Sequence, residues 1–282
     1  MILFKFNLKY KSNCKKQVNM GFNKCLSKKL YLTLFLLMNI CFSQDSNKSK
    51  QYHFDGNVNI TNNGFSFIPL FSLGKPATTV NLSIGDDRLT FDPQFRFDLE
   101  GLKPWSILFT WHYKLIQKKR FRLKIGAYLP AYAFNKISYE KDGDLKENLN
   151  PQRYFITDLS VSYLLNKNMN IGLFYLRGMG LESEDQTKTG NFISLRSNVR
   201  NIKISNSLNL IWSPEFYYLK VDENDGIFSA QTINLMIKNS HFNFSTTMNK
   251  AIESRINAKS FDWNIGINYA FSNKFIKKKK TL

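Results

Sequence analysis

The sequence of 282 residues has little cysteine, little histidine and no long hydrophobic run. Its three cysteines, Cys14, Cys25 and Cys41, all lie near the N-terminus. The main apolar run, residues 30–42, is too short to cross a bilayer as a helix. Beyond this region, neither a disulfide framework nor thiol chemistry is available to the chain.

Residues 1–43 have the make-up of an export signal. They hold eight lysines and no acidic residue, followed by the apolar run, and the residues ending at Ser43 suit a cleavage site. We therefore expect a signal peptide at 1–43 and a mature chain that begins at Gln44. Two alternatives stay open, with Met20 as the start or Cys41 as a lipid-modified N-terminus.

Acidic residues are also scarce, because 40 lysines and arginines face 21 aspartates and glutamates, for a formal net charge of +19. The eight lysines of the signal and five more in the tail at 272–282 account for much of this excess. The remaining body carries no basic stripe interleaved with aromatic residues. A nucleic-acid partner is therefore not expected.

The sequence does contain strict alternation, which is clearest at residues 260–271. Large apolar side chains occupy every second position there, and small or polar residues such as Asp262, Asn264 and Gly266 occupy the others. Successive side chains of a β-strand point to opposite faces. This strand therefore has one apolar and one polar face, as in the wall of a barrel between lipid and water.

The same alternation recurs along the chain and predicts an all-β fold, a transmembrane antiparallel β-barrel of about 12 strands. Strands are expected near 65–73, 78–84, 88–99, 105–115, 121–128, 152–165, 168–179, 190–200, 203–220, 227–238, 241–250 and 260–271.

The expected organisation is an N-terminal lead-in at 44–64, the barrel at 65–271 and a basic C-terminal tail at 272–282. The turn sequence at 62–64 leaves an alternative open, because it would make 53–61 a strand. An even strand total then requires 78–99 to be one bulged strand.

A soluble β-sandwich also alternates, but the export signal, the alternately short and long connections and the aromatic residues favour a membrane barrel. Aromatic residues on the apolar faces are expected to form a girdle at the membrane interface. The members of this aromatic girdle are Trp105, Trp111, Tyr113, Trp212, Trp263 and Tyr269.

Four stretches resemble an uncharacterised family of outer-membrane β-barrel proteins of Bacteroidota. They are GKPA at 74–77, FDPQFRFDLEGLKPWS at 91–106, DENDG at 222–226 and FDWNIGINYAF at 261–271. The resemblance implies a barrel in the outer membrane. It implies no assigned activity and no functional residue.

Charged residues on the polar faces form the candidate site. If two hairpins are regular, Asp92 faces His112 and His112 faces Lys124, which gives a row across three strands. The remaining members of this lumenal charge cluster are Arg96, Lys114 and Arg122. Two interpretations stay open, namely charges that satisfy one another in a narrow lumen and a constriction that contacts anions or other solutes.

An enzyme is not expected. Barrel phospholipases and acyltransferases need a serine and a histidine within hydrogen-bond reach, and neither His53, His112 nor His241 stands in a His-x-Ser sequence. The acidic turn at 222–226 lacks the spacing and the distal glutamate of a calcium loop. We expect no catalytic residue, no cofactor and no metal site. A lipid-modifying enzyme using His241 is the weaker alternative.

The predicted function is a small passive channel or solute-uptake pore in the outer membrane, with both termini periplasmic. The alternative is a plugged barrel with a structural or surface-interaction role. Expected partners are outer-membrane lipid and lipopolysaccharide, reached through divalent cations on acidic loops, the barrel-assembly machinery, and a small solute that the sequence does not identify.

Overall fold

The computed structural model describes residues 51–68, 72–141, 144–182 and 187–276. The chain divides into two units, residues 1–48 and 49–282, and all described residues lie in the second unit. The predicted signal peptide lies outside the described residues, as does the end of the basic tail. No helix in the described part of the chain has the length and hydropathy to cross a membrane.

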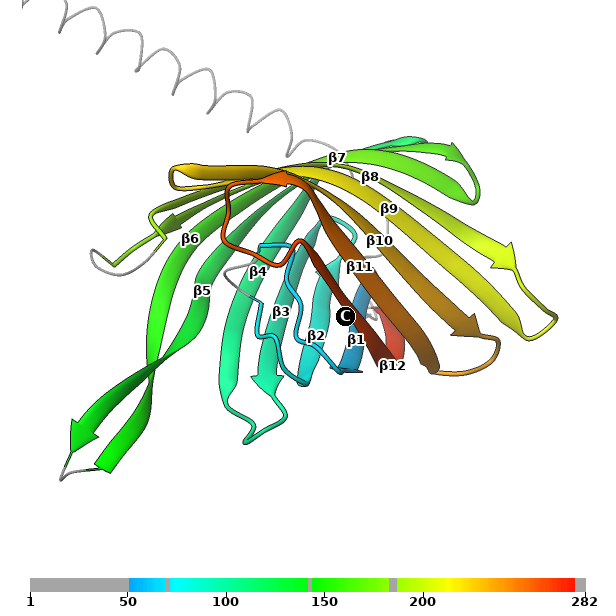
Figure 1. The fold of residues 1–282 in the computed structure, drawn as a ribbon. Helices are drawn as coiled ribbons and strands as arrows, with labels where there is room; N and C mark the ends of the chain where they lie inside the picture. The colour runs from blue at the N-terminus through cyan, green and yellow to red at the C-terminus, as the bar shows by residue number, and fades with distance from the viewer. Residues whose placement is uncertain (1–50, 69–71, 142–143, 183–186, 277–282) are drawn as a thin grey trace, which may run out of the picture. The chain divides into compact units, whose positions relative to one another are not determined.

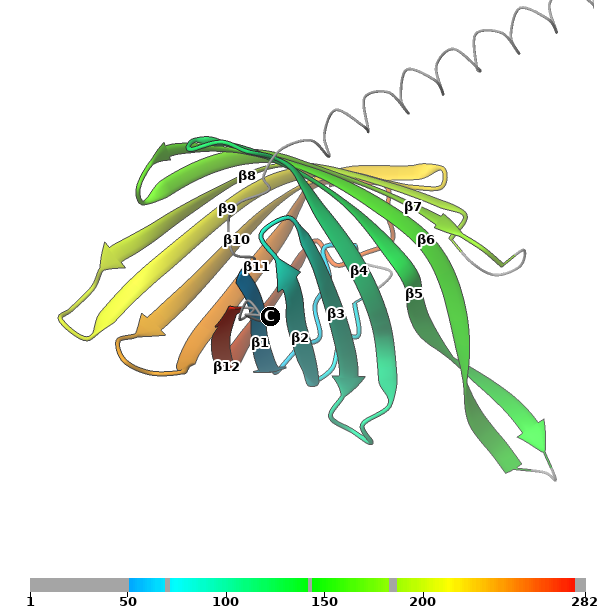
Figure 2. The same ribbon diagram turned by 180° about the vertical axis from the view of Figure 1, so that it is seen from behind.

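The described strands close into one antiparallel barrel in which each strand pairs with its neighbours in sequence and β1 pairs with β12 (Figures 1 and 2). The twelve strands are β1 (Gln51–Thr61), β2 (Ala77–Asp86), β3 (Leu89–Asp98), β4 (Pro104–Gln117), β5 (Phe121–Lys141), β6 (Asp144–Asn166), β7 (Met169–Gly180), β8 (Thr189–Lys203), β9 (Leu208–Val221), β10 (Asn224–Ile237), β11 (Phe242–Ser254) and β12 (Phe261–Ile276). The predicted fold class is confirmed.

The alternation in β12 follows the prediction. Trp263, Ile265 and Ile267 are 44%, 53% and 50% exposed on the outside of the barrel. Gly266 and Asn268, at alternate positions of the same strand, are buried on the inside. A closed barrel has no sheet edge, so its two faces are an outer surface and a lumen. Apolar residues face out and polar residues face in, which excludes the soluble sandwich.

The N-terminal boundary of the barrel differs from the prediction. Residues 51–61 are not a lead-in but strand β1, which pairs with β12 from Gln51↔Ile276 to Thr61↔Gly266. The strand expected near 65–73 is absent from its described residues. The strands expected near 78–84 and 88–99 are present as β2 and β3, so the alternative of one bulged strand at 78–99 was wrong. The total stays even because one strand is gained and another lost. β12 also continues five residues past Phe271, so the predicted boundary there was wrong.

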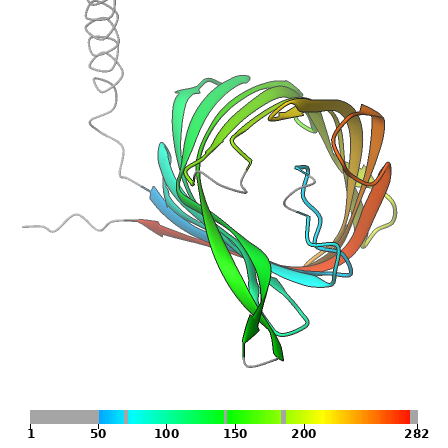
Figure 3. The same cartoon turned by 60° about the vertical axis from the view of Figure 1, so that its left-hand side comes forward.

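The connections between strands were predicted to be alternately short and long. The short turns lie at one end of the barrel as predicted, but some of the connections expected to be long are short. The turns after β2, β4, β6, β8 and β10 lie at one end, together with the start of β1 and the end of β12. At the opposite end, two connections expected to be long are short, because β5 runs to Lys141 and β6 begins at Asp144, and only Asp222 and Glu223 separate β9 from β10. β5 and β6 stay paired to Lys141↔Asp144, so their hairpin projects well beyond the barrel (Figure 3).

Trp105 was predicted to belong to the outward-facing aromatic girdle, and the structure contradicts this prediction. Arg96 pairs with Ser106 while the next residue, Phe97, pairs with Pro104, so Trp105 is the extra residue of a β-bulge. A bulge re-aims a side chain, and Trp105 is only 7% exposed. Alternation alone places Trp105 outside, and the bulge turns it inward.

Candidate functional site in the barrel lumen

The strand register around the predicted lumenal charges differs from the prediction. Asp92 pairs with Thr110 and His112 pairs with Thr90, two residues away from the predicted partnership. On the other side, His112 pairs with Gly126, and Lys124 pairs with Lys114. The predicted row of Asp92, His112 and Lys124 was therefore wrong as a set of direct cross-strand partners.

Asp92 and His112 nevertheless touch, because diagonal neighbours on adjacent strands come within reach of long side chains. His112 Nδ1 forms a hydrogen-bonded pair with Asp92 Oδ2. Thr90 Oγ1 donates to the same carboxylate at 2.9 Å, and Ser83 Oγ donates to Asp92 Oδ1 at 2.5 Å. Asp92 thus joins β2, β3 and β4 by side-chain hydrogen bonds.

A third residue joins the contact between Asp92 and His112, namely Asp158 on β6, which the sequence analysis missed. His112 Nε2 lies 3.2 Å from Asp158 Oδ2, and the Asp158 side chain is fully buried. Gly126 lies between them on β5, where an added Cβ would collide with both His112 and Asp158. Because Gly126 has no side chain, the His112 side chain on β4 can reach Asp158 on β6. Alternation along β6 was the available signal, because it places Asp158 on the inner face with Ser160 and Ser162.

The other predicted members lie apart from this contact. Arg96 donates through Nε to Gln94 Oε1 at 2.7 Å, and its guanidinium carbon is 5.2 Å from the centre of the Trp105 ring. Lys114 and Lys124 face each other across β4 and β5. Arg122 is exposed. The functional role proposed for this cluster stays a prediction.

A serine and a histidine do meet in the lumen, though not in a catalytic arrangement. His53 Nε2 is 3.1 Å from Ser83 Oγ, and the same nitrogen is 3.9 Å from Asp55 Oδ2. A nucleophilic triad needs the two ring nitrogens to contact the serine and the acid separately. The serine that would act as nucleophile instead donates to Asp92.

His241, the residue of the weaker enzyme alternative, is engaged by the backbone. Its Nδ1 lies 3.0 Å from the carbonyl oxygen of Ala270, while Ser240 Oγ accepts from the backbone amide of Phe242. Neither contact prepares a nucleophile. The described residues also hold no group of three or more His, Cys, Asp or Glu placed to bind a metal ion.

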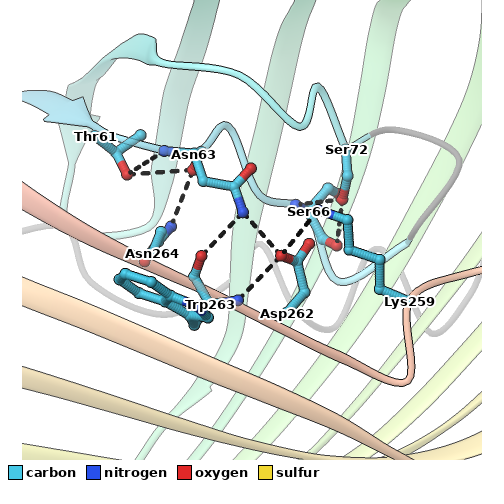
Figure 4. A network of polar contacts seen from close by, with 8 residues as sticks. All are labelled: Thr61, Asn63, Ser66, Ser72, Lys259, Asp262, Trp263 and Asn264. Carbon is cyan, nitrogen blue, oxygen red and sulfur yellow. Dashed lines mark hydrogen bonds and ion pairs between the residues drawn. The ribbon is translucent and has the colours of Figure 1, made fainter.

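The connection between β1 and β2 folds into the lumen, a feature that the sequence analysis did not foresee. We call its described residues, 62–68 and 72–76, the inner loop (Figure 3). Asn63 fixes it to β12 by donating from Nδ2 to Asp262 Oδ1 at 2.8 Å and to the Trp263 carbonyl at 2.9 Å (Figure 4). Ser72 Oγ accepts from the Ser66 amide at 2.9 Å, which ties the two limbs together.

Glycine permits the close approach of this loop to the barrel wall. A Cβ at Gly64 would lie 2.7 Å from the Trp105 ring and 2.9 Å from Leu73 Cβ. Gly64 also accepts the Leu73 amide at 2.7 Å and donates to the Lys75 carbonyl at 2.7 Å. The inward turn of Trp105 and the entry of the inner loop therefore belong to one packing arrangement.

The inner loop crosses to the far wall of the barrel. The Phe67 ring lies 6.4 Å from that of Phe192 on β8 and 5.8 Å from that of Tyr217 on β9. In a ring of twelve strands, β8 stands opposite β2. Phe67 and Ile68 pack against a buried apolar cluster on that wall, which includes Leu219 and Phe228. This contact narrows the lumen.

The space that remains is a cavity of about 720 Å³ inside the barrel. One side is polar and carries Asp92, Arg96 and His112. Apolar residues from the inner loop and from β4 to β8 form much of the remaining lining, namely Phe65, Phe67, Ile68, Leu108, Ala131, Ala133, Ile156, Phe174, Leu176 and Phe192. Lumens of water-filled barrels are usually polar, so this amphipathic lining is a distinctive feature.

An ion pair at the rim ties the inner loop to the next connection. Lys75 Nζ lies 2.6 Å from Glu100 Oε2 in the loop between β3 and β4. The hydrogen bond from Lys75 holds the pKa of the Glu100 carboxyl below its ordinary value. This pair is well exposed, so its stabilising effect is small.

The outer surface retains the other predicted aromatic residues. Trp111, Trp212, Trp263 and Tyr269 are between 40% and 45% exposed, and Tyr113 is half-buried. Their positions on the outer surface are confirmed. Their role as a membrane girdle stays a prediction.

No family model and no curated protein matches the chain, but 176 solved chains do. A KdgM porin solved with oligogalacturonate is 8% identical, with a TM-score of 0.46 over 78% of this chain and 99% of that chain. An outer membrane channel from Pseudomonas putida F1 is 10% identical, with a TM-score of 0.46 over 82% of this chain and 97% of that chain. A NanC porin is 8% identical, with a TM-score of 0.45 over 80% and 100%.

These structures are porin-like barrels and channels of outer membranes, and the likeness to them concerns the fold. None of the findings links the chain to Bacteroidota. At such low identity the likeness carries no information on the solute.

Proposed function

We propose that this protein is a passive outer-membrane channel whose lumen is narrowed by the inner loop. The observation that carries the proposal is a closed barrel with an apolar outer surface around a cavity of about 720 Å³. Outward side chains such as Leu173, Ile193 and Phe216 are 50–55% exposed. A continuous exposed apolar surface of this kind needs a lipid environment.

Both chain ends of the barrel lie at the end with the short turns. Short turns are periplasmic in barrels of this type, so we place the termini in the periplasm. The projecting β5–β6 hairpin and the rim ion pair then face the outside of the cell. Outer-membrane lipid, lipopolysaccharide and the barrel-assembly machinery remain the proposed partners.

Solute flux tests this function directly. In proteoliposomes containing the purified barrel, we expect small solutes to enter measurably faster than in protein-free vesicles. Larger oligosaccharides should be excluded, because the inner loop leaves limited room in the lumen. A barrel that is folded, as judged by its heat-modifiable gel mobility, yet passes no solute would contradict the proposal.

The inner loop also favours a second candidate, a plugged barrel with a structural or surface-interaction role. Phe67 reaches the opposite wall, and Asn63 holds the loop at its base. Under this alternative, the same vesicles would show no flux until the loop is removed.

A further inference from the structure

We infer that the lumenal cavity binds a small amphipathic anion, with Arg196 on β8 receiving the carboxylate and the apolar wall receiving a ring or an alkyl chain. This inference names a ligand class for the proposed channel. It rests on the proposed function in one respect, because it takes the bound molecule to be the solute that passes through the channel.

Arg196 lines the cavity and lies over an aromatic ring. Its guanidinium carbon is 3.9 Å from the centre of the Phe174 ring, a close cation–π contact. Phe174 in turn lies 6.0 Å, ring centre to ring centre, from Phe192. The guanidinium is therefore held in place by the apolar wall instead of reaching into open solvent.

One nitrogen of Arg196 is left for a ligand. Its Nη2 is buried and makes no hydrogen bond with any described residue. Glu215 lies opposite Arg196 on β9, yet no ion pair within 4.0 Å joins the two in the described part of the chain. A buried donor without an acceptor is costly, and a planar guanidinium matches a carboxylate in geometry as well as in charge.

The rest of the cavity gives the ligand its second property. Ile156 belongs to the buried apolar cluster of β5 and β6, and Leu176 packs against this cluster. From the other side, Phe67 of the inner loop contributes its ring. Binding sites of this size with mostly apolar walls and few polar groups suit small organic ligands. An acid with a ring or a short alkyl chain fits both the charge and the walls.

Binding to native protein tests the inference with three probes. 4-Phenylbutyrate has both ring and carboxylate, 4-phenylbutanol lacks the charge, and butyrate lacks the ring. Using barrels in phosphatidylcholine nanodiscs, with empty nanodiscs subtracted, calorimetry should show 4-phenylbutyrate binding about tenfold or more tightly than either of the others. Equal binding of all three probes would overturn the inference.

Variants locate the site. Arg196→Gln should weaken 4-phenylbutyrate binding about tenfold or more and leave 4-phenylbutanol unchanged, because a charge-assisted hydrogen bond is lost. Leu176→Ala should weaken both aromatic probes by roughly threefold or more, through lost apolar contact. The control Arg200→Gln removes an exposed arginine of the same strand and should change neither. Unaltered binding in Arg196→Gln would exclude this residue as the anchor.

Flux measurements separate this inference from the proposed function. Solute flux without selective 4-phenylbutyrate binding would overturn the ligand class and leave the channel standing. Selective binding without any flux would overturn the channel and leave the binding site standing.

Discussion

At the scale of single residues, Asp158 is the buried acid on which the lumenal cluster depends. It is the only member with a fully buried side chain among Asp92, His112 and Asp158, and it connects β6 to the pair formed by β3 and β4. A buried carboxylate is stable only while its hydrogen-bonding partner is present. We therefore expect these three residues to act first as a brace between strands.

Asp158→Asn tests the bracing role. We expect the free energy of unfolding to fall by roughly 1–3 kcal/mol, because His112 loses a charged acceptor in a buried position. Denaturant titration of the refolded barrel, followed by heat-modifiable gel mobility, measures the change. Asp55→Asn is the matched control, since that lumenal acid is 43% exposed. Equal losses in both variants would show that burial of Asp158 has no special effect.

Sequence alone predicted that Asp92 and His112 face the lumen, but not which residues they meet there. Alternation correctly placed Asp92, His112 and Lys124 on the inner face, because side-chain direction depends only on the pleat. Their partners depend on hairpin register, which is set by where each hairpin turns and by register shifts in β4 at Trp105 and beyond Lys114. The pairing next to the two turns is Phe97↔Pro104 and Gln117↔Arg122, which differs from that of the regular hairpins. A bulge has no reliable signal in a single sequence, so the Asp92–His112–Asp158 set could not be predicted.

At the scale of elements, β12 defines the difference between the two faces. Ile265 is 53% exposed on the outside, whereas its neighbour Asn264 lines the cavity. An arginine on the lipid face near the middle of a bilayer costs roughly 2–4 kcal/mol.

Ile265→Arg should therefore reduce the amount of folded, membrane-inserted barrel, while Asn264→Arg should insert nearly as well as the native protein. Urea-resistant membrane fractions and heat-modifiable mobility report the outcome. Insertion of both variants at the same level would mean that the outer face is not in lipid.

The inner loop shows why one element was misassigned. Phe65 and Phe67 alternate with Ser66 and resemble a short strand. The apolar partners of Phe67 are Phe192 and Tyr217, which lie more than 120 positions later in the sequence. Local periodicity cannot distinguish a ring that faces lipid from one that packs across a lumen. The twelve-strand total was nevertheless predicted, because an even number follows from termini on one side.

At the scale of the whole molecule, the orientation in the membrane is open to a matched test. The turns at Asp222–Glu223 and Lys167–Asn168 are both two residues long and lie at opposite ends of the barrel. A small epitope inserted after Glu223 should be labelled on intact cells, whereas one inserted after Lys167 should be labelled only after permeabilisation. Labelling of the second site on intact cells would invert the proposed topology.

The measurement that tests the central claim most directly is single-channel conductance in planar bilayers, for the native barrel and for a variant whose residues 65–72 are replaced by two glycines. Gly64 and Leu73 are already joined by a backbone hydrogen bond of 2.7 Å, so the shortened connection fits the barrel. We predict a small, steady conductance for the native protein and a several-fold larger one for the variant. A native barrel that is silent while the variant conducts would show a plug, and silence in both would contradict the channel altogether.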